Sequence, residues 1–479
     1  MQQQCPRAVR VFVPPALALA LSALGCNRAA PTAKIPPPRW AGVTVRVAAP
    51  DGAPRKLVHN LGREWANAAG ATLADVAPGG DWPAADLVLI PAADLPRWAA
   101  AGKVAPLPRP DAVDAFMPLY RTRLLAWGGT PYALPVIGDG PVCVYRRDLY
   151  ADPAAQQAYR DKYHRQLAPP ETWDEFADQA EFFAARRARP SLPPLPADDA
   201  GLTAAFAAVA APLAVRAVPT EAARAGQRSA KPFSFQYDVD TGLPQLAEPG
   251  FVEALTLLKR MQPHRAKTPT AAEAMKGDQA ALGYVTLADL GGVGPEEARR
   301  WGVCRPPGSR RVFDNLPPVI DRGLNTVPFL GAGAVLGLVP AGAANAEAAF
   351  DLLTYLAGPD VSTVVVHTPE YGSGPFRDRH VDPGHEQGWL NYGLEAPQTA
   401  LLRTLQREVA DPRVDNPALV LRLPGRAGHV AALAAEVRAA LAGGDPAAAL
   451  KSAADKWRAL DGDPAKARAD YRRGVGLQP

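Results

Sequence analysis

VTVRV at residues 43–47 alternates apolar and polar side chains with the period of a β-strand that has one buried face. A helical pattern follows over residues 57–69, and LVLI at residues 87–90 then forms a short, wholly apolar run. Such a run is typical of a parallel strand that is covered on both faces. Strand, helix and strand in this order predict an α/β sheet.

Amphipathic helices dominate the rest of the chain. TWDE at residues 172–175 has the form of a capping box, in which Thr172 accepts from the amide of Glu175 and the Glu175 carboxylate reaches back. Near the C-terminus, two apolar stripes that are separated by residues 443–444 predict two helices, with Leu460 on the second stripe. About 440 residues are more than one hydrophobic core holds, so we expect two lobes.

The N-terminal residues differ from the rest of the chain. Arg7 and Arg10 make a basic start, and residues 11–24 carry no charge. This apolar stretch is too short for an ordinary transmembrane helix, which takes about 20 apolar residues. A basic start, a short apolar run and small residues before a cleavage point are typical of a secretory signal. We therefore predict a signal peptide at residues 1–25.

LSALGC at residues 21–26 resembles a bacterial lipobox, in which the cysteine thiol receives a lipid before cleavage. This resemblance predicts lipidation of Cys26, and a plain signal peptide with an incidental cysteine is the alternative. Residues 26–41 are rich in proline and alanine, which indicates a flexible tether between the membrane and the first packed element.

Charge and cysteine content narrow the classes of function. The formal net charge of +4 falls to +2 once Arg7 and Arg10 are removed with the signal. A balanced surface lacks the basic footprint that nucleic-acid binding leaves. Beyond the signal, Cys143 and Cys304 are the cysteines, and two lone cysteines are more often buried apolar residues than a disulfide, although pairing stays open. No CxxC pair or Cys/His cluster indicates a metal, and we expect no cofactor.

Seven ordered stretches resemble the family 1 extracellular solute-binding proteins, the maltose-binding-like receptors of ABC importers. Each match is short, and their order and spacing from about residue 43 to the end make the resemblance specific. The stretches are YALP at 132–135 with Asp139 and VCVYRRDL at 142–149, LAPP at 167–170 before the Thr172 capping box, DTG at 240–242 before a helix at 249–258, KGDQAA at 276–281, FLGAGAVLGLVP at 329–340 with a helix capped by Asn345, SGPFR at 373–377, and the tail from LPG at 423–425 to GVG at 474–476.

The resemblance implies a two-lobed α/β fold of the type II periplasmic-binding-protein class, with a ligand cleft between lobes that close by hinge motion. It places residues 42–137 and 282–331 in lobe 1, and residues 138–281 and 332–479 in lobe 2. The expected partners are a small solute, with a carbohydrate as the expected class, the permease subunits of an ABC importer, and the membrane through the lipid anchor. The expected protein is an exported monomer in the periplasm or at the cell surface.

Candidate ligand contacts lie at the predicted lobe crossings. A carbohydrate needs aromatic faces for its C–H surfaces and carboxylates or amides for its hydroxyls. Asp139, between two glycines, suits a ligand contact or a turn, Tyr284 a ligand contact or core packing, and Arg377 a ligand hydroxyl or a structural carboxylate. Tyr237 lies on an alternating aromatic run that is more often a core strand, and Trp82 on a loop from which it could reach the cleft.

One departure from the family concerns the ligand. Members often carry a tryptophan soon after the glycine pair of the third crossing, whereas Gly333 is followed here by Ala334. The missing aromatic residue weakens the expectation of a stacked sugar. Two other classes of function remain open: a secreted glycan-active enzyme, which would need two carboxylates across a cleft, and a ligand-binding sensor subunit.

Other motifs carry little weight. GAGAVLG at residues 331–337 misses the spacing of a dinucleotide fingerprint by one residue and leads into a strand-like run. Asp238 begins a run that resembles a calcium loop but lacks two of the ligands. His380 and His385 match no zinc spacing, and we expect both on a surface loop.

Overall fold

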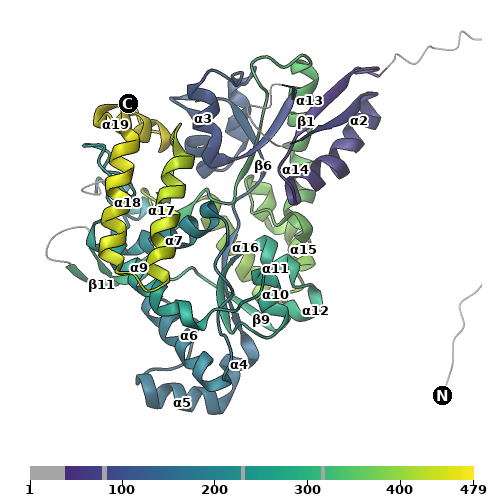
Figure 1. The fold of residues 1–479 in the computed structure, drawn as a ribbon. Helices are drawn as coiled ribbons and strands as arrows, with labels where there is room; N and C mark the ends of the chain where they lie inside the picture. Colours follow the sequence, from purple (N-terminus) through teal and green to yellow (C-terminus); the bar gives the residue numbers. More distant parts are fainter. Residues whose placement is uncertain (1–37, 78–83, 228–231, 314–318, 479) are drawn as a thin grey trace, which may run out of the picture.

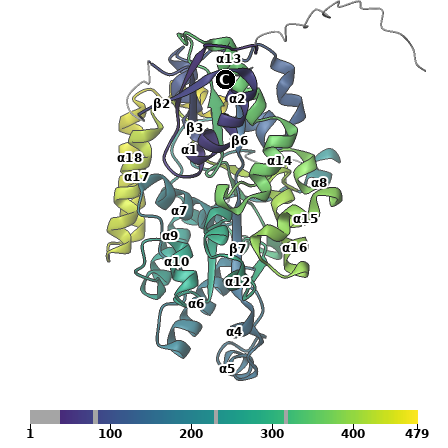
Figure 2. The same cartoon turned by 90° about the vertical axis from the view of Figure 1, so that its right-hand side faces the viewer.

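The computed structural model describes residues 38–77, 84–227, 232–313 and 319–478 (Figure 1). The predicted signal peptide, Cys26 and Trp82 lie outside these residues, so their predicted roles are not tested by the structure. The described chain forms two α/β lobes, one above the other in Figures 1 and 2, with a helical column along one side.

The first lobe is built on a five-stranded sheet with the order β2-β1-β3-β13-β6. Strand β1 is parallel to both β2 and β3, as the predicted strand–helix–strand pattern requires, whereas β13 is antiparallel to β3 and β6. The strands are β1 (Thr44–Ala48), β2 (Thr72–Val76), β3 (Leu87–Pro91), β6 (Ala133–Ile137) and β13 (Val335–Leu338).

Helices from two distant parts of the chain cover this sheet. The predicted helix at 57–69 is part of a longer helical run, made of α1 (Ala53–Leu57), a π-helical turn (Val58–Gly62) and α2 (Arg63–Ala69). Helix α13 (Ala346–Leu356) packs beside this run, and α14 (Pro359–His367) packs against α13 and β6 (Figure 2). Gly337 lets α13 lie close to the sheet, because a Cβ atom there would be 2.3 Å from Leu353 Cδ1.

The second lobe has a three-stranded antiparallel sheet at its centre, with the order β8-β7-β9. These strands are β7 (Pro141–Arg146), β8 (Leu282–Thr286) and β9 (Trp301–Cys304). Thr172 caps helix α6 (Trp173–Arg187) through the amide of Glu175 at 3.2 Å, as predicted. The Glu175 carboxylate accepts from the amide of Glu171 at 2.8 Å, so the capping box is only half of the predicted one.

Strand pairing differs from the predicted lobe boundaries at two places. Strand β8 was predicted in lobe 1 and pairs with β7 of the second sheet, and β13 was predicted in lobe 2 and pairs with β3 and β6 of the first. Each strand joins the sheet in which its backbone groups find antiparallel partners. The chain therefore changes sheets between β6 and β7, and again between β12 (Phe329–Leu330) and β13.

The C-terminal helices form the yellow column of Figure 1. The predicted pair is present as α17 (Arg426–Leu441) and α18 (Pro446–Asp461), which pack against each other and against helices α7 (Asp199–Ala214) and α9 (Pro249–Met261) of the second lobe. Leu460 was predicted on the buried stripe of α18 but is 52% exposed. A third helix, α19 (Pro464–Gly474), follows.

The remaining elements connect these parts. Among the described residues no single helix is long and apolar enough to cross a membrane, and α13 with α14 meets the length and composition criteria only as a pair bent by 54°. The other helices are α3 (Leu95–Ala100), α4 (Arg147–Ala151), α5 (Pro153–Tyr163), α8 (Thr220–Arg224), α10 (Ala271–Lys276), α11 (Leu287–Gly292), α12 (Pro295–Ala298), α15 (Glu386–Trp389) and α16 (Ala396–Ala410), and the other strands are β4 (Ala126–Trp127), β5 (Thr130–Pro131), β10 (Ser309–Val312), β11 (Val319–Asn325) and β14 (Ala418–Leu419).

Candidate ligand-binding site

A cavity of about 810 Å³ lies between the two lobes. The first lobe contributes Pro91 and Asp94 at the end of β3, and the second lobe contributes most of the remaining wall. That wall comes from residues 192–198, the first turns of α7, strand β8 and the start of α17, and residues 332–333 of the crossing segment close it. The volume is within the range of about 300–1,000 Å³ that is typical of small-molecule sites.

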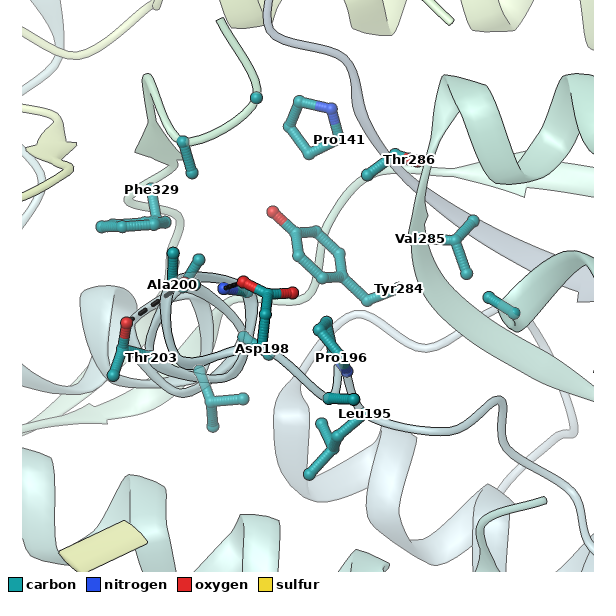
Figure 3. A pocket seen from close by; sticks show the side chains of 18 of the residues that line it. Pro141, Leu195, Pro196, Asp198, Ala200, Thr203, Tyr284, Val285, Thr286 and Phe329 are labelled. Carbon is teal, nitrogen blue, oxygen red and sulfur yellow. Dashed lines mark hydrogen bonds between the residues drawn. The ribbon is translucent and has the colours of Figure 1, made fainter. Parts of the chain in front are cut away.

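Tyr284 is the most prominent side chain in this cavity. Figure 3 shows its ring projecting from β8 into the space between Pro141, Phe329 and the start of α7. Its hydroxyl makes no hydrogen bond to any described residue, and the Trp173 ring packs edge-on against it at 5.8 Å. Burial, together with the nearby charge of Asp139, raises the pKa of Tyr284, so the hydroxyl is neutral and can both donate and accept.

Asp139 lies where the chain leaves the first sheet, and it both lines the cavity and holds the crossing segments together. Its carboxylate accepts from the amides of Gly331 at 2.5 Å and Gly333 at 2.9 Å, and its own amide donates to the Tyr120 hydroxyl at 2.8 Å. A Cβ atom at Gly333 would be 2.7 Å from Asp139 Oδ1, so the contact requires glycine there. Burial raises the pKa of Asp139 even though the glycine amides act in the opposite direction.

Two other predicted contacts do not line the cavity. Tyr237 is fully buried, donates to Asp461 at 2.8 Å and stacks on Trp457 with ring centres 5.3 Å apart, so it is a core residue. Arg377 donates to the carbonyl of Ala357 and lies over a phenylalanine ring. Burial lowers the pKa of Arg377 to about 10, and its donors are occupied by backbone rather than directed at a ligand.

Several polar groups of the cavity were not predicted from the sequence. Asp94 of the first lobe and Arg426 at the start of α17 form an ion pair at 3.0 Å between residues 332 positions apart. Asp198 caps α7 through the amide of Gly201 at 2.8 Å. The Asp198 signal is present in the sequence as an N-cap residue, but it stands in an alanine- and proline-rich stretch whose pattern is poor.

Unpartnered polar atoms are concentrated at this cavity. Four buried side-chain atoms of its lining find no hydrogen-bond partner among the described residues, namely Trp173 Nε1, Gln236 Oε1, Arg265 Nε and Arg426 Nε. An unpartnered buried donor or acceptor costs about 1–3 kcal/mol, so such atoms are uncommon unless a ligand or water satisfies them. Three donors and one acceptor of the lining residues are therefore buried without a partner in this structure.

A second cavity of about 340 Å³ adjoins the first, and the two share Pro141, Trp173, Tyr284 and Phe329 in their walls. Its far side carries Glu408, which pairs with Arg305 at 2.8 Å and Arg413 at 2.9 Å. The Tyr284–Trp173 pair therefore stands between two spaces rather than at the end of one.

No group of three or more His, Cys, Asp or Glu side chains that could hold a metal ion is found in the described part of the chain. His380, predicted on a surface loop, is fully buried, and its Nδ1 atom accepts from the amide of Phe376 at 3.2 Å. Burial lowers the pKa of His380, so this side chain is a neutral part of the core.

Two α/β lobes, joined by crossing segments and with a largely apolar cavity that holds a few polar groups between them, define a two-lobed binding protein. The chain belongs to the family of bacterial extracellular solute-binding proteins, whose sequence profile matches residues 62–385. The resemblance found in the sequence is thereby confirmed, and with it the fold class. A comparison with curated proteins finds no significant match.

Two solved structures share this fold. A solute-binding protein of an ABC transporter from Agrobacterium radiobacter K84, in complex with ribitol, is 18% identical with a TM-score of 0.62, covering 88% of this chain and 99% of its own. Maltose-bound MalE3 of T. maritima is 15% identical with a TM-score of 0.62, covering 87% of this chain and 100% of its own.

Proposed function

We propose that this protein captures a carbohydrate or polyol in the cavity between its lobes and delivers it to an ABC importer. The observation that carries the proposal is the Tyr284 hydroxyl, which lines the cavity and has no hydrogen-bond partner among the described residues. Four further residues of the wall each hold a buried polar atom that also lacks a described partner. The family match supports a solute-binding role, and the two structural neighbours bind ribitol and maltose.

Within this site we propose that Tyr284 and Trp173 contact the ligand directly. The exposed part of the Tyr284 ring offers a face to C–H groups, and its hydroxyl offers hydrogen bonds to hydroxyl groups, with the unpartnered Trp173 Nε1 atom buried beside it. Asp139 acts mainly through the crossing segments that it holds, because its carboxylate oxygens already accept from two glycine amides. A ligand contact by Trp82 remains a prediction.

The test compares two tyrosines. Tyr284→Phe removes a hydroxyl from the cavity, whereas Tyr237→Phe removes one from the core. A thermal-shift screen of ribitol, maltose and related sugars identifies a ligand, because a ligand that binds the folded state raises the melting temperature. Titration calorimetry then measures its affinity. We expect Tyr284→Phe to weaken binding about 5- to 30-fold, as the loss of one hydrogen bond implies, and Tyr237→Phe to leave affinity unchanged. Equal effects of the two variants would remove Tyr284 from the site.

We further propose that residues 1–25 are a signal peptide, that Cys26 carries the lipid, and that residues 26–41 tether a monomeric receptor to the membrane. The lipobox-like LSALGC supports the anchor, and the extracellular family supports export. The lobes would close around the ligand by a hinge at the crossing segments.

A further inference from the structure

We propose that the cavity selects uncharged, hydroxyl-rich ligands and discriminates against sugar acids and phosphorylated sugars. This inference rests on the proposed function and narrows its substrate class. It follows from the charges that line the cavity and from the partners that neutralise them.

Carboxylates outnumber cations in the cavity wall. Among the described lining residues, the acidic side chains are Asp94, Asp139, Asp198 and Asp289, and the basic side chains are Arg265 and Arg426. Asp94 and Arg426 neutralise each other in their ion pair at 3.0 Å. Three carboxylates then face a single guanidinium, a formal excess of two negative charges. If the buried Asp139 takes up a proton, as its raised pKa favours, an excess of one remains.

The three remaining carboxylates accept hydrogen bonds from neutral groups, so no described cation neutralises them. Asp139 accepts from glycine amides, and Asp289 accepts from the amide of Thr286 at 3.0 Å and its hydroxyl at 2.7 Å. Asp198 accepts from one amide at the start of α7, and its second oxygen makes no hydrogen bond to a described residue. Figure 3 shows the Asp198 carboxylate and the Tyr284 hydroxyl on either side of the same open space.

Arg265 is the one lining cation without a carboxylate partner among the described residues. It donates to the Pro193 carbonyl at 3.0 Å, and its Nε atom is unpartnered. Burial lowers the pKa of Arg265 to about 10, so the side chain is still a cation at neutral pH. It can donate to a ligand hydroxyl, but its single charge offsets only one of the three carboxylates. Carboxylate oxygens accept hydrogen bonds from sugar hydroxyls and repel an anionic group.

Matched pairs of probes test the selectivity. Affinities are measured by titration calorimetry at low ionic strength for sorbitol against gluconate, glucose against glucuronate, and maltose against maltobionate. The neutral member should bind at least about 10-fold more tightly in each pair that binds. Added salt should narrow the gap, because it screens the repulsion. Asp198→Asn should also reduce the difference in affinity between the neutral and the acidic member of a pair, whereas Arg265→Gln should increase this difference.

The outcomes distinguish a failure of the charge selectivity from a failure of the carbohydrate-binding function. Equal or tighter binding of the acidic member overturns the charge selection and leaves the carbohydrate-binding function intact. If no member of any pair binds, and the wider screen of sugars and polyols gives no ligand, the proposed function fails and this inference fails with it.

A different observation supports a second inference: Cys143 and Cys304 form a disulfide in the exported protein. Both are free thiols in this structure, and they are directly opposed on the antiparallel strands β7 and β9. Opposed residues of such a pair place their side chains on the same face, with Cα atoms roughly 4.5–5.5 Å apart. A disulfide requires about 4.4–6.8 Å. The family is extracellular, where disulfides persist.

The more exposed cysteine reacts first. Cys304 is partly exposed, whereas Cys143 is fully buried, and the thiol of Cys304 together with burial raises the pKa of Cys143. The Cys304 thiolate attacks the disulfide of a thiol–disulfide oxidant and forms a mixed disulfide, and Cys143 then displaces the oxidant. Both thiol protons are lost, two electrons pass to the oxidant, and its disulfide becomes two thiols. Tyr284 is paired with Cys143 from the other side, on β8, so the disulfide would lie one strand away from the cavity tyrosine.

Peptide mapping tests this bond. The protein is exported in cells, alkylated in denaturant without reductant, digested and analysed by mass spectrometry. We expect a peptide pair linked through Cys143 and Cys304, which dithiothreitol releases, and an alkylated Cys143 in the Cys304→Ser variant. The melting temperature of the wild type should fall in dithiothreitol, and that of a Cys143→Ala/Cys304→Ala variant should not. Full alkylation of both cysteines in the exported wild type overturns the inference.

Discussion

Replacing Asp139 with alanine should destabilise the protein far more than a loss of one surface carboxylate would. Asp139 is 4% exposed, and its two oxygens accept from Gly331 and Gly333 at 2.5 and 2.9 Å. Alanine would leave both amides without a partner in a buried crossing segment. An unpartnered buried donor costs about 1–3 kcal/mol, and the relief of desolvating the carboxylate offsets part of the sum. We expect Asp139→Ala to lower the free energy of unfolding by about 2–5 kcal/mol.

Urea unfolding measures this loss, with Asp198→Ala as the matched control. Asp198 also lines the cavity but accepts from a single amide as a helix cap, so its loss should cost about 1 kcal/mol. The loss in the free energy of unfolding for Asp139→Asn should lie between these two values, because the amide keeps one acceptor and turns a donor toward the other glycine. The reasoning fails if Asp139→Ala unfolds at the wild-type urea midpoint, or if it matches the control. A pure ligand contact would lower affinity and leave stability unchanged.

Three further predictions concern charge, closure and attachment. Asp86 is buried; desolvation acts to raise its pKa, but hydrogen bonds from Arg46 and Asn345 outweigh this effect and hold the pKa at about 2 against an ordinary 3.8. Asp86→Asn should therefore lower the free energy of unfolding by about 2 kcal/mol at neutral pH. In calorimetry, the difference in stability between wild type and variant should vanish as pH falls from above 3.8 toward 2. A difference that stays constant with pH would contradict the lowered pKa of Asp86. A double-mutant cycle on Asp94 and Arg426 should give a coupling of about 1 kcal/mol in unfolding, and Asp94→Asn should enlarge the ligand-free protein in small-angle scattering; zero coupling would mean the ion pair does not join the lobes. Cys26→Ser should move the protein from the membrane to the soluble fraction, and continued membrane retention would argue against the lipid anchor.

The strands of the first lobe show how far the sequence is informative. Residues 43–47 and 87–90 could be recognised because burial on one face or on both leaves a periodic or continuous apolar pattern. The pairing of β13 with β3 could not, because a run such as residues 329–340 has the same composition in either lobe. Partner choice depends on contacts more than 200 residues apart, which no local pattern records.

The site residues also divide into those with a local sequence signal and those that depend on distant contacts. Asp139 could be located because a carboxylate between two glycines at a lobe crossing is locally unusual, but its partners are 192 and 194 residues away. Tyr237 was a candidate because the aromatic residues 233, 235 and 237 alternate and could share one face, but residues 234, 236 and 238 are buried as well, so this segment has no exposed face. The ion pair of Asp94 and Arg426 left no signal, because each is an ordinary charged residue beside a helix.

Strand β13 has a consequence for how the chain is made. It lies in the middle of the first sheet, between β3 and β6, and it follows β6 by about 200 residues. Until that strand has been synthesised, β3 and β6 have no common partner. At roughly 5–20 residues per second, the first lobe stays incomplete for on the order of 10–40 seconds after β6 leaves the ribosome. A chain that must be exported thus remains open to the export machinery, because its order of strands delays its own folding.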